Sequence, residues 1–294
     1  LIGGAIWIAV SLATGVEGGA GEIMALANET GRLHIVDWKF DLFAMSGPIV
    51  AISFFIQLMQ DYGTDQVTVQ RLMATGSFGK TVKSVAFNAC TDFFIIALLL
   101  FIGLGLFAFF QSMDLPDDLS TDKIMPYYII HHLPQGISGL LITAVFAAAM
   151  SSMDSGINSI ATVLVTDFKT GGGNEVKTAR ILTLVLGVFA TALAFYVSTL
   201  DSILDAFFGF MGLFSAPVLA LFLLGVLTKK GSFKGWLIGL VASIIASLWV
   251  QHFTEVHKIY YIPVSFFASF GTALLASRFF NPEPAPKELT IWKR

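Results

Sequence analysis

The chain has 294 residues, of which 55% are hydrophobic and only 13% are charged. Soluble domains carry about 25% charged residues, so this composition excludes an ordinary soluble protein, a disordered chain and a basic nucleic-acid-binding protein. The single cysteine, Cys90, excludes a disulfide framework and a cysteine-based zinc site. The chain begins Leu1-Ile2-Gly3-Gly4 inside an apolar run, with no initiator Met and no charged leader. We interpret it as a truncated chain rather than one with a signal peptide.

Apolar stretches long enough to cross about 30 Å of hydrocarbon recur along the chain. They are continuous, which favours membrane helices over the alternating strands of a β-barrel. The sequence predicts eight spans, at 1–16, 41–60, 85–111, 137–166, 179–199, 204–228, 235–252 and 260–280. The predicted fold class is therefore an all-α polytopic membrane protein, with one transmembrane domain over 1–294.

The distribution of cations predicts the orientation of these spans. If the loop 61–84 is cytoplasmic, thirteen of the 17 Lys and Arg residues lie on that side and four lie on the other. This positive-inside bias predicts a cell membrane location and a cytoplasmic tail at 281–294. The long connections 17–40 and 112–136 are then outside, with an amphipathic stretch at Gly21–Thr30 and a short surface helix at Lys123–Leu133.

Oxygen-bearing residues form a stripe in the span 137–166. On a helix, a polar and small-residue face recurs at three- and four-residue steps; its members are Ala148, Ser151, Ser155, Asn158, Ser159 and Thr162. Asp154 lies at the edge of the stripe. Hydroxyl and carbonyl oxygens with a nearby carboxylate suit an alkali cation, whereas a purely structural stripe would serve helix packing. Packing alone does not require a carboxylate at this depth.

A second polar cluster ends the span 41–60. Pro48 removes a main-chain hydrogen bond early in the span, and Gln57, Gln60, Asp61 and Asp65 follow. This pattern predicts a discontinuous helix that lines a cavity, and an ordinary cytoplasmic helix end is the alternative.

Three further positions stand out in other spans. Asp92 lies within the span 85–111, with Asn88 one turn earlier on the same face. Asp205 is interpreted as an acid at a helix N-terminus, and Pro217 predicts a kink in the span 204–228.

Two motifs together resemble the sodium:solute symporter family. The run Tyr62–Arg71 is similar to a loop element of that family. The run Phe146–Ser152, with Asn158-Ser159, resembles its sodium-site helix. The resemblance covers nearly the whole chain, and it is strongest to the bacterial sialic acid and sugar branch across Gly136–Asp167. It implies a leucine-transporter-type fold with two inverted five-helix repeats.

The resemblance also implies which part of that fold the chain contains. The segment 1–16 corresponds to the end of the fifth core helix, 41–228 to core helices six to ten, and 235–280 to two peripheral helices. The first four core helices are then missing. A chain without them is not expected to transport by itself, because the first core helix supplies sodium and substrate contacts in the family.

The resemblance implies site residues one by one. The Ala148 carbonyl and the Ser151 and Ser152 hydroxyls match the common sodium site of the family, and Asp154 and Ser155 match hydroxyls of a second sodium site. Asp154 is a departure, because the family has a hydroxyl there.

Substrate contacts are expected from the second cluster and from the span 85–111. The candidates are Phe54, Gln57, Gln60, Asp61 and Asp92. Asp61 stands where the sugar branch has an aromatic inner gate, with Tyr62 beside it, and Asp92 stands where that branch has a sugar-contacting Lys. These departures argue against a galactose-like contact set.

The predicted function is sodium-coupled import of a small polar organic solute, such as a sugar, a sialic acid or a related organic acid, by alternating access. The expected partners are Na+, the solute and the lipid bilayer. No constellation of catalytic residues suggests an enzyme, and no feature specifies an oligomeric state. Two alternatives remain open: a transporter-like sensor domain that signals to a cytoplasmic module, and a proton-coupled carrier that uses Asp154.

Overall fold

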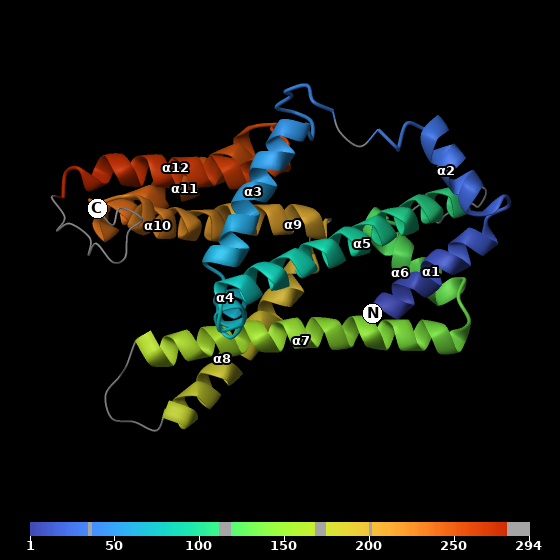
Figure 1. Ribbon diagram of the computed structural model, residues 1–294, viewed down its shortest axis with the longest axis horizontal. Coiled ribbons are helices and arrows are strands. Elements are labelled where there is room, and N and C mark those ends of the chain that lie inside the picture. The colour runs from blue at the N-terminus through green and yellow to red at the C-terminus, as the bar shows by residue number, and fades with distance from the viewer. Residues whose placement is uncertain (35–36, 112–118, 168–174, 200–201, 281–294) are drawn as a thin grey trace. The chain divides into compact units, whose positions relative to one another are not determined.

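The computed structural model describes residues 1–34, 37–111, 119–167, 175–199 and 202–280 (Figure 1). These residues form helices and connecting turns, and no β-strand occurs among them. Their packing separates two compact units. The first unit contains residues 1–35 and 71–201, and the second contains 36–70 and 202–294. Each unit has its own buried apolar core.

The first unit contains the three longest helices of the described residues, α5, α7 and α8. Its elements are α1 (Ile2–Gly15), α2 (Gly19–Glu29), α5 (Phe78–Gln111), the 3-10 turn η1 (Thr121–Lys123), α6 (Ile124–His131), α7 (Gln135–Asp167) and α8 (Glu175–Val197). Helix α4 (Gln66–Met73) crosses the boundary between the units.

The described residues of the second unit contain three helical segments long enough to cross a membrane and the shorter helix α3. Its elements are α3 (Gly47–Gly63), α9 (Ile203–Phe210), the π-helical turn η2 (Met211–Ser215), α10 (Ala216–Leu227), α11 (Phe233–Phe253), the 3-10 turn η3 (Lys258–Tyr260) and α12 (Tyr261–Ser277).

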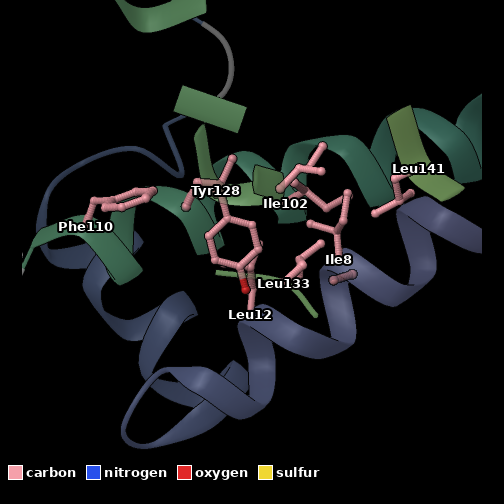
Figure 2. Close-up of a cluster of buried hydrophobic side chains, with 10 residues drawn as sticks. Ile8, Leu12, Ile102, Phe110, Tyr128, Leu133 and Leu141 are labelled. Carbon is pink, nitrogen blue, oxygen red and sulfur yellow. The ribbon is translucent and has the colours of Figure 1, made fainter. Parts of the chain in front are cut away.

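The core of the first unit lies where α1, α5 and α6 meet. Ile8, Leu12, Ile102 and Tyr128 point toward one another in this cluster (Figure 2) and are each at most 2% exposed. The Tyr128 hydroxyl is paired with the Ser11 hydroxyl at 3.0 Å, so its polar end is satisfied inside the cluster. The predicted surface helix at Lys123–Leu133 is therefore anchored, because one face of α6 is buried.

Small residues allow α11 and α12 to pack closely in the second unit. Buried small residues follow one face of each helix; they are Gly235, Gly239, Ser243 and Ser247 on α11, and Ser265, Ser269, Ala273 and Ser277 on α12. Such seams bring helix backbones together in membrane proteins. The Trp236 Nε1–H also donates to the Pro217 carbonyl at 2.9 Å, which ties α11 to α10.

Six helices of the described residues are long and apolar enough to cross a membrane, and the bent pair α1 and α2 could form a seventh span. The predicted spans 137–166 and 235–252 match α7 and α11 within two residues at each end. The span predicted at 41–60 is displaced, because α3 begins only at Gly47. The preceding residues form a turn in which the Asp41 carboxylate accepts the N–H of Phe43 at 2.8 Å.

Candidate functional site

The predicted sodium-site residues all lie on α7, a continuous helix of 33 residues. Ala148, Ser151, Ser152 and Ser155 follow one another at steps of three, one and three residues, so they share one face of the helix. The Ser155 hydroxyl donates to the Ser151 carbonyl at 3.0 Å. This face therefore presents hydroxyl and carbonyl oxygens of consecutive turns in one line.

Most of this oxygen-bearing face is open. Ala148, Ser151, Ser152 and Asp154 are exposed, and Ser155 is half-buried. A hard cation in a protein is held by about six oxygen ligands that surround it. One helix face supplies ligands from one side only, so a complete sodium site on α7 requires oxygens from a facing element.

Asp154 follows Ser151 by three residues and lies at the edge of the same face. A carboxylate there could offset the charge of a cation or carry a proton. Groups of three or more His, Cys, Asp or Glu side chains that could hold a metal ion do not occur within the described residues.

The polar cluster of α3 differs from its prediction. The segment Gly47–Gly63 is one uninterrupted helix, and Pro48 occupies its first turn rather than a break within a span. Proline fits this position because an N–H in the first turn has no helical partner. The chain leaves the helix only at Thr64 and Asp65, where the Asp65 carboxylate accepts the N–H of Thr68 at 2.8 Å and caps α4.

The segment that contains α9, η2 and α10 is a continuous span of 25 residues with an irregular turn inside it. The N–H of Ala216 bonds to the Met211 carbonyl five residues earlier, which defines the π-helical turn. Pro217 follows directly and cannot donate a main-chain hydrogen bond. Pro217 in the sequence predicts a kink here, but no pattern in the sequence marks Met211 and Ser215 as residues of a site. Single π-helical turns occur frequently at functional sites.

Gln57 and Gln60 face this turn. Both side chains line a small hollow together with Met211 and Ser215, and the hollow has room for about one water molecule. The Oε1 atom of Gln60 is buried and has no hydrogen-bond partner within the described residues. The structure therefore brings two of the predicted substrate residues together at an irregular backbone segment.

The other substrate candidates are distributed differently. Phe54 lies one turn before Gln57 on α3 and is 49% exposed, and Asp61 follows Gln60 and is half-buried. Asp92 belongs to the first unit, on α5, where its carboxylate accepts a hydrogen bond from the Asn88 side-chain amide at 2.8 Å. The predicted pairing of Asn88 and Asp92 on one face is therefore confirmed.

Asp205 is confirmed as an acid at a helix N-terminus. It lies in the first turn of α9, where the Ser202 hydroxyl accepts its N–H at 3.3 Å. Its carboxylate also forms an ion pair with Lys258 at the start of η3. These contacts give Asp205 a structural role at one end of the second unit.

Comparison with known proteins finds a match to the model of the sodium:solute symporter family over residues 1–243. The chain is 30% identical to the sodium/sialic acid symporter NanT of Aliivibrio fischeri, over 87% of the chain and 53% of that protein. It is likewise 30% identical to the sodium/sialic acid symporter SiaT of Proteus mirabilis, over 89% and 55%. A mouse sodium-coupled monocarboxylate transporter 2 is 28% identical, over 79% and 40%.

A solved structure also resembles the chain. It is the substrate-bound, outward-open state of a Na+-coupled sialic acid symporter, with a TM-score of 0.82 and 27% identity over 97% of this chain and 61% of that one. The all-helical, leucine-transporter-type fold is thereby confirmed. The chain spans about half the length of the two curated bacterial relatives.

Proposed function

Because the chain belongs to the sodium:solute symporter family, we propose that it forms part of a sodium-coupled importer of a small polar organic solute. The observation that carries this proposal is the oxygen-lined face of α7, where Ser151 and Ser152 are exposed beside a carbonyl-bearing turn. Its role is transport rather than catalysis. The protein is a multi-pass membrane transporter, and we assign its C-terminus to the cytoplasm from the bias of its cations.

Sodium occupies the face of α7 in this proposal. The Ala148 carbonyl and the Ser151 and Ser152 hydroxyls hold one ion, and Asp154 and Ser155 contribute to a second position on the next turn. Each sodium ion that enters down the membrane potential contributes about 2.3 kcal/mol per 100 mV, which drives the solute inward.

In this proposal the solute binds at the polar face of α3 in the second unit. Asp92 on α5 is a separate candidate contact in the first unit. Gln57 and Gln60 donate and accept hydrogen bonds, and Phe54 supplies an apolar surface for a ring or a carbon chain. Asp61 and Asp92 accept hydrogen bonds from solute hydroxyls or amines. Relatives of the chain are symporters of sialic acid and of monocarboxylates, so we infer a sugar, a sialic acid or a related organic acid.

A proton-coupled carrier is the second candidate, and Asp154 is the observation that favours it. Its carboxylate is exposed at the edge of the face that carries Ser151. A carboxylate can bind and release a proton, whereas the hydroxyl that the family has at this position cannot. In that case protonation of Asp154 replaces the binding of one cation.

Uptake of radiolabelled sialic acid, sugars and monocarboxylates into proteoliposomes of the full-length protein tests both candidates. We expect uptake to need an inward sodium gradient, and Ser152→Ala to raise the half-saturating sodium concentration about tenfold or more, because one oxygen ligand is lost. Thr166→Ala is the matched control, since Thr166 is exposed on the same helix and its hydroxyl bonds only within the helix. Uptake that ignores sodium, follows a pH gradient and disappears in Asp154→Asn would replace the sodium assignment with proton coupling.

A further inference from the structure

A second cavity lies in the first unit, away from α7, and nothing in the proposed transport function uses it. It has a volume of about 490 Å³ and is lined by residues of α5, η1 and α6 and by Arg32, three residues after the end of α2. Its wall is mostly apolar, with Leu106, Phe107, Phe110 and Met125 among its members. This size and character are typical of small-molecule sites, which are apolar pockets of roughly 300–1,000 Å³ with a few polar groups.

One side chain brings charge to this cavity. The guanidinium of Arg32 lies over the ring of Phe107, with 3.7 Å between the guanidinium carbon and the ring centroid. This cation–π contact uses the face of the guanidinium and leaves the N–H groups at its edge free to donate. The ion pair found among the described residues joins Lys258 to Asp205, so Arg32 has no acidic partner in that part of the chain.

The backbone holds Arg32 in this position. Gly31 has a φ of +71°, its N–H bonds to the Asn28 carbonyl at 3.1 Å, and the N–H of Arg32 bonds to the Ala27 carbonyl at 2.8 Å. This hydrogen-bond pair is the Schellman motif that ends a helix at a left-handed residue. The cation is therefore placed by a defined helix end and by the ring of Phe107.

The floor of the cavity is equally fixed. Leu106 and Phe110 belong to the buried core of the first unit, and Phe110 lies in that cluster beside Tyr128 (Figure 2). Ile124 and Met125 of α6 pack against the same core. Gln111 and Thr121 add hydrogen-bonding groups at the wall. An apolar body thus has a preformed surface close to the Arg32 guanidinium, for which the described residues provide no acidic partner.

We propose that this cavity binds an amphipathic monoanion, whose carboxylate or phosphate head group lies at Arg32 and whose apolar body lies against the side chains of α5 and α6. The guanidinium edge donates two hydrogen bonds to the oxygens of the head group. The apolar body replaces water on the aromatic and aliphatic wall. The ligand comes either from the outer aqueous phase or from the outer lipid leaflet, because the cation pattern assigns this end of the first unit to the outer side.

Equilibrium binding of radiolabelled octanoate to the full-length protein tests the proposal. The protein is held in nanodiscs of phosphatidylcholine, in sodium-free choline buffer, so that sodium-coupled binding does not contribute. We expect saturable binding that unlabelled octanoate displaces and that octan-1-ol, with the same chain and no charge, displaces at least tenfold less well. Arg32→Gln is expected to weaken binding about tenfold or more, because a charge-assisted contact is lost.

Two further variants separate a specific site from general charge or folding effects. Lys123→Gln removes an exposed cation of η1 that does not line the cavity, and it should leave octanoate binding unchanged. Phe107→Leu keeps an apolar side chain but removes the ring below the guanidinium, and it should weaken binding about threefold. Thermal midpoints close to that of the unmodified protein are required for all three variants.

The origin of the ligand is resolved by changing the lipid. If phosphatidylglycerol in the nanodiscs competes with octanoate, and Arg32→Gln abolishes this competition, the natural ligand is an anionic lipid. If the affinity for octanoate is equal in both lipids, the ligand comes from water. The proposal is overturned if octanoate binds Arg32→Gln and the unmodified protein equally, or if octan-1-ol displaces it as well as octanoate does. Uptake that stays sodium-dependent in Arg32→Gln would leave the transport function standing in either case.

Discussion

The Ser53 hydroxyl donates a hydrogen bond of 2.7 Å to the main-chain carbonyl of Ile259, 206 residues further along the chain. In a regular helix that carbonyl would accept the N–H of residue 263, but residue 263 is a proline and has no N–H. The side chain on α3 therefore replaces a bond that the start of α12 cannot make. Both residues are 1% exposed, so no water is available to take over this role.

Loss of this hydroxyl should destabilise the second unit. Ser53→Ala removes a hydrogen bond to a buried carbonyl, and we expect the free energy of unfolding to fall by about 1–3 kcal/mol. Thermal unfolding of the purified protein in detergent measures the effect. Ser198→Ala is the control, because Ser198 is exposed and its hydroxyl bonds locally to the Phe195 carbonyl at 2.8 Å.

A second substitution tests the cause directly. Pro263→Ala restores an N–H to the first turn of α12, so Ser53→Ala should be less harmful in a Pro263→Ala background than alone. If Ser53→Ala lowers the thermal midpoint by the same amount in both backgrounds, the hydroxyl does not compensate for the proline.

Two glycine substitutions are expected to have opposite effects, because Gly239 lies in the seam between α11 and α12 and Gly271 lies on α12 in open space. A Cβ at Gly239 would lie 2.9 Å from the Ala273 Cβ and 3.1 Å from the Ala273 nitrogen, which forces the helices apart. We expect Gly239→Ala to lower the free energy of unfolding by about 1–3 kcal/mol. At Gly271 no atom would lie within 4 Å of the new Cβ, so Gly271→Ala should stabilise α12 by up to about 1 kcal/mol.

Thermal unfolding of the two variants side by side gives the answer, since the substitution is the same and only its surroundings differ. Equal midpoints, or a higher midpoint for Gly239→Ala, would show that this seam is not closely packed.

The Ser11 and Tyr128 pair predicts coupling within the first unit. Tyr128→Phe removes the hydroxyl that pairs with Ser11 at 3.0 Å and should lower the free energy of unfolding by about 0.5–1.5 kcal/mol. The double variant Ser11→Ala, Tyr128→Phe should lose less than the sum of the single losses, because neither polar group is then left unpaired. A double-mutant cycle by thermal or denaturant unfolding measures the coupling, and strict additivity would contradict it.

The predictions from the sequence were correct where a feature depends on residues that are neighbours in the sequence. The ends of α7 were predicted well, because polar loops flank a continuous apolar run. Asp205 was predicted correctly, because a helix N-terminus is defined by its own residues. The role predicted for Pro48 was wrong, because Pro48 lies in the first turn of α3. Proline both starts and interrupts helices, and the sequence alone does not separate the two cases.

The candidate sites divide in the same way. The stripe on α7 followed from residue spacing alone, and its use as a sodium site stays a prediction, because the facing oxygens of such a site are distant in sequence. The hollow at Gln57 and Gln60 depends on the π-helical turn at Met211–Ser215. No amino-acid pattern distinguishes a π-helical turn, with its hydrogen bond between residues five apart, from an ordinary helical turn. The position of Arg32 over Phe107 depends on packing between α5 and the end of α2.

The turn before η3 predicts a dependence of stability on pH. The Nδ1 atom of His257 accepts the N–H of Ile259 at 3.3 Å, which requires an unprotonated Nδ1. Burial lowers the pKa of His257 below its usual value, Lys258 lowers it further, and Asp205 opposes both effects. The unfolded chain therefore takes up this proton at a higher pH than the folded chain does. The contribution of His257 to stability is thus fully present above about pH 6.5, and it is lost as the pH falls below that value.

Comparison of thermal midpoints at pH 7.5 and pH 5.5 tests this dependence, with His257→Asn as the matched variant. Asparagine retains an oxygen that accepts the N–H two residues on, but it does not titrate. The four remaining histidines contribute equally to both proteins, so the difference between their midpoint shifts isolates His257. We expect the unmodified protein to lose more stability at pH 5.5 than His257→Asn does. Equal losses would mean that the proton binds His257 without breaking its bond to Ile259.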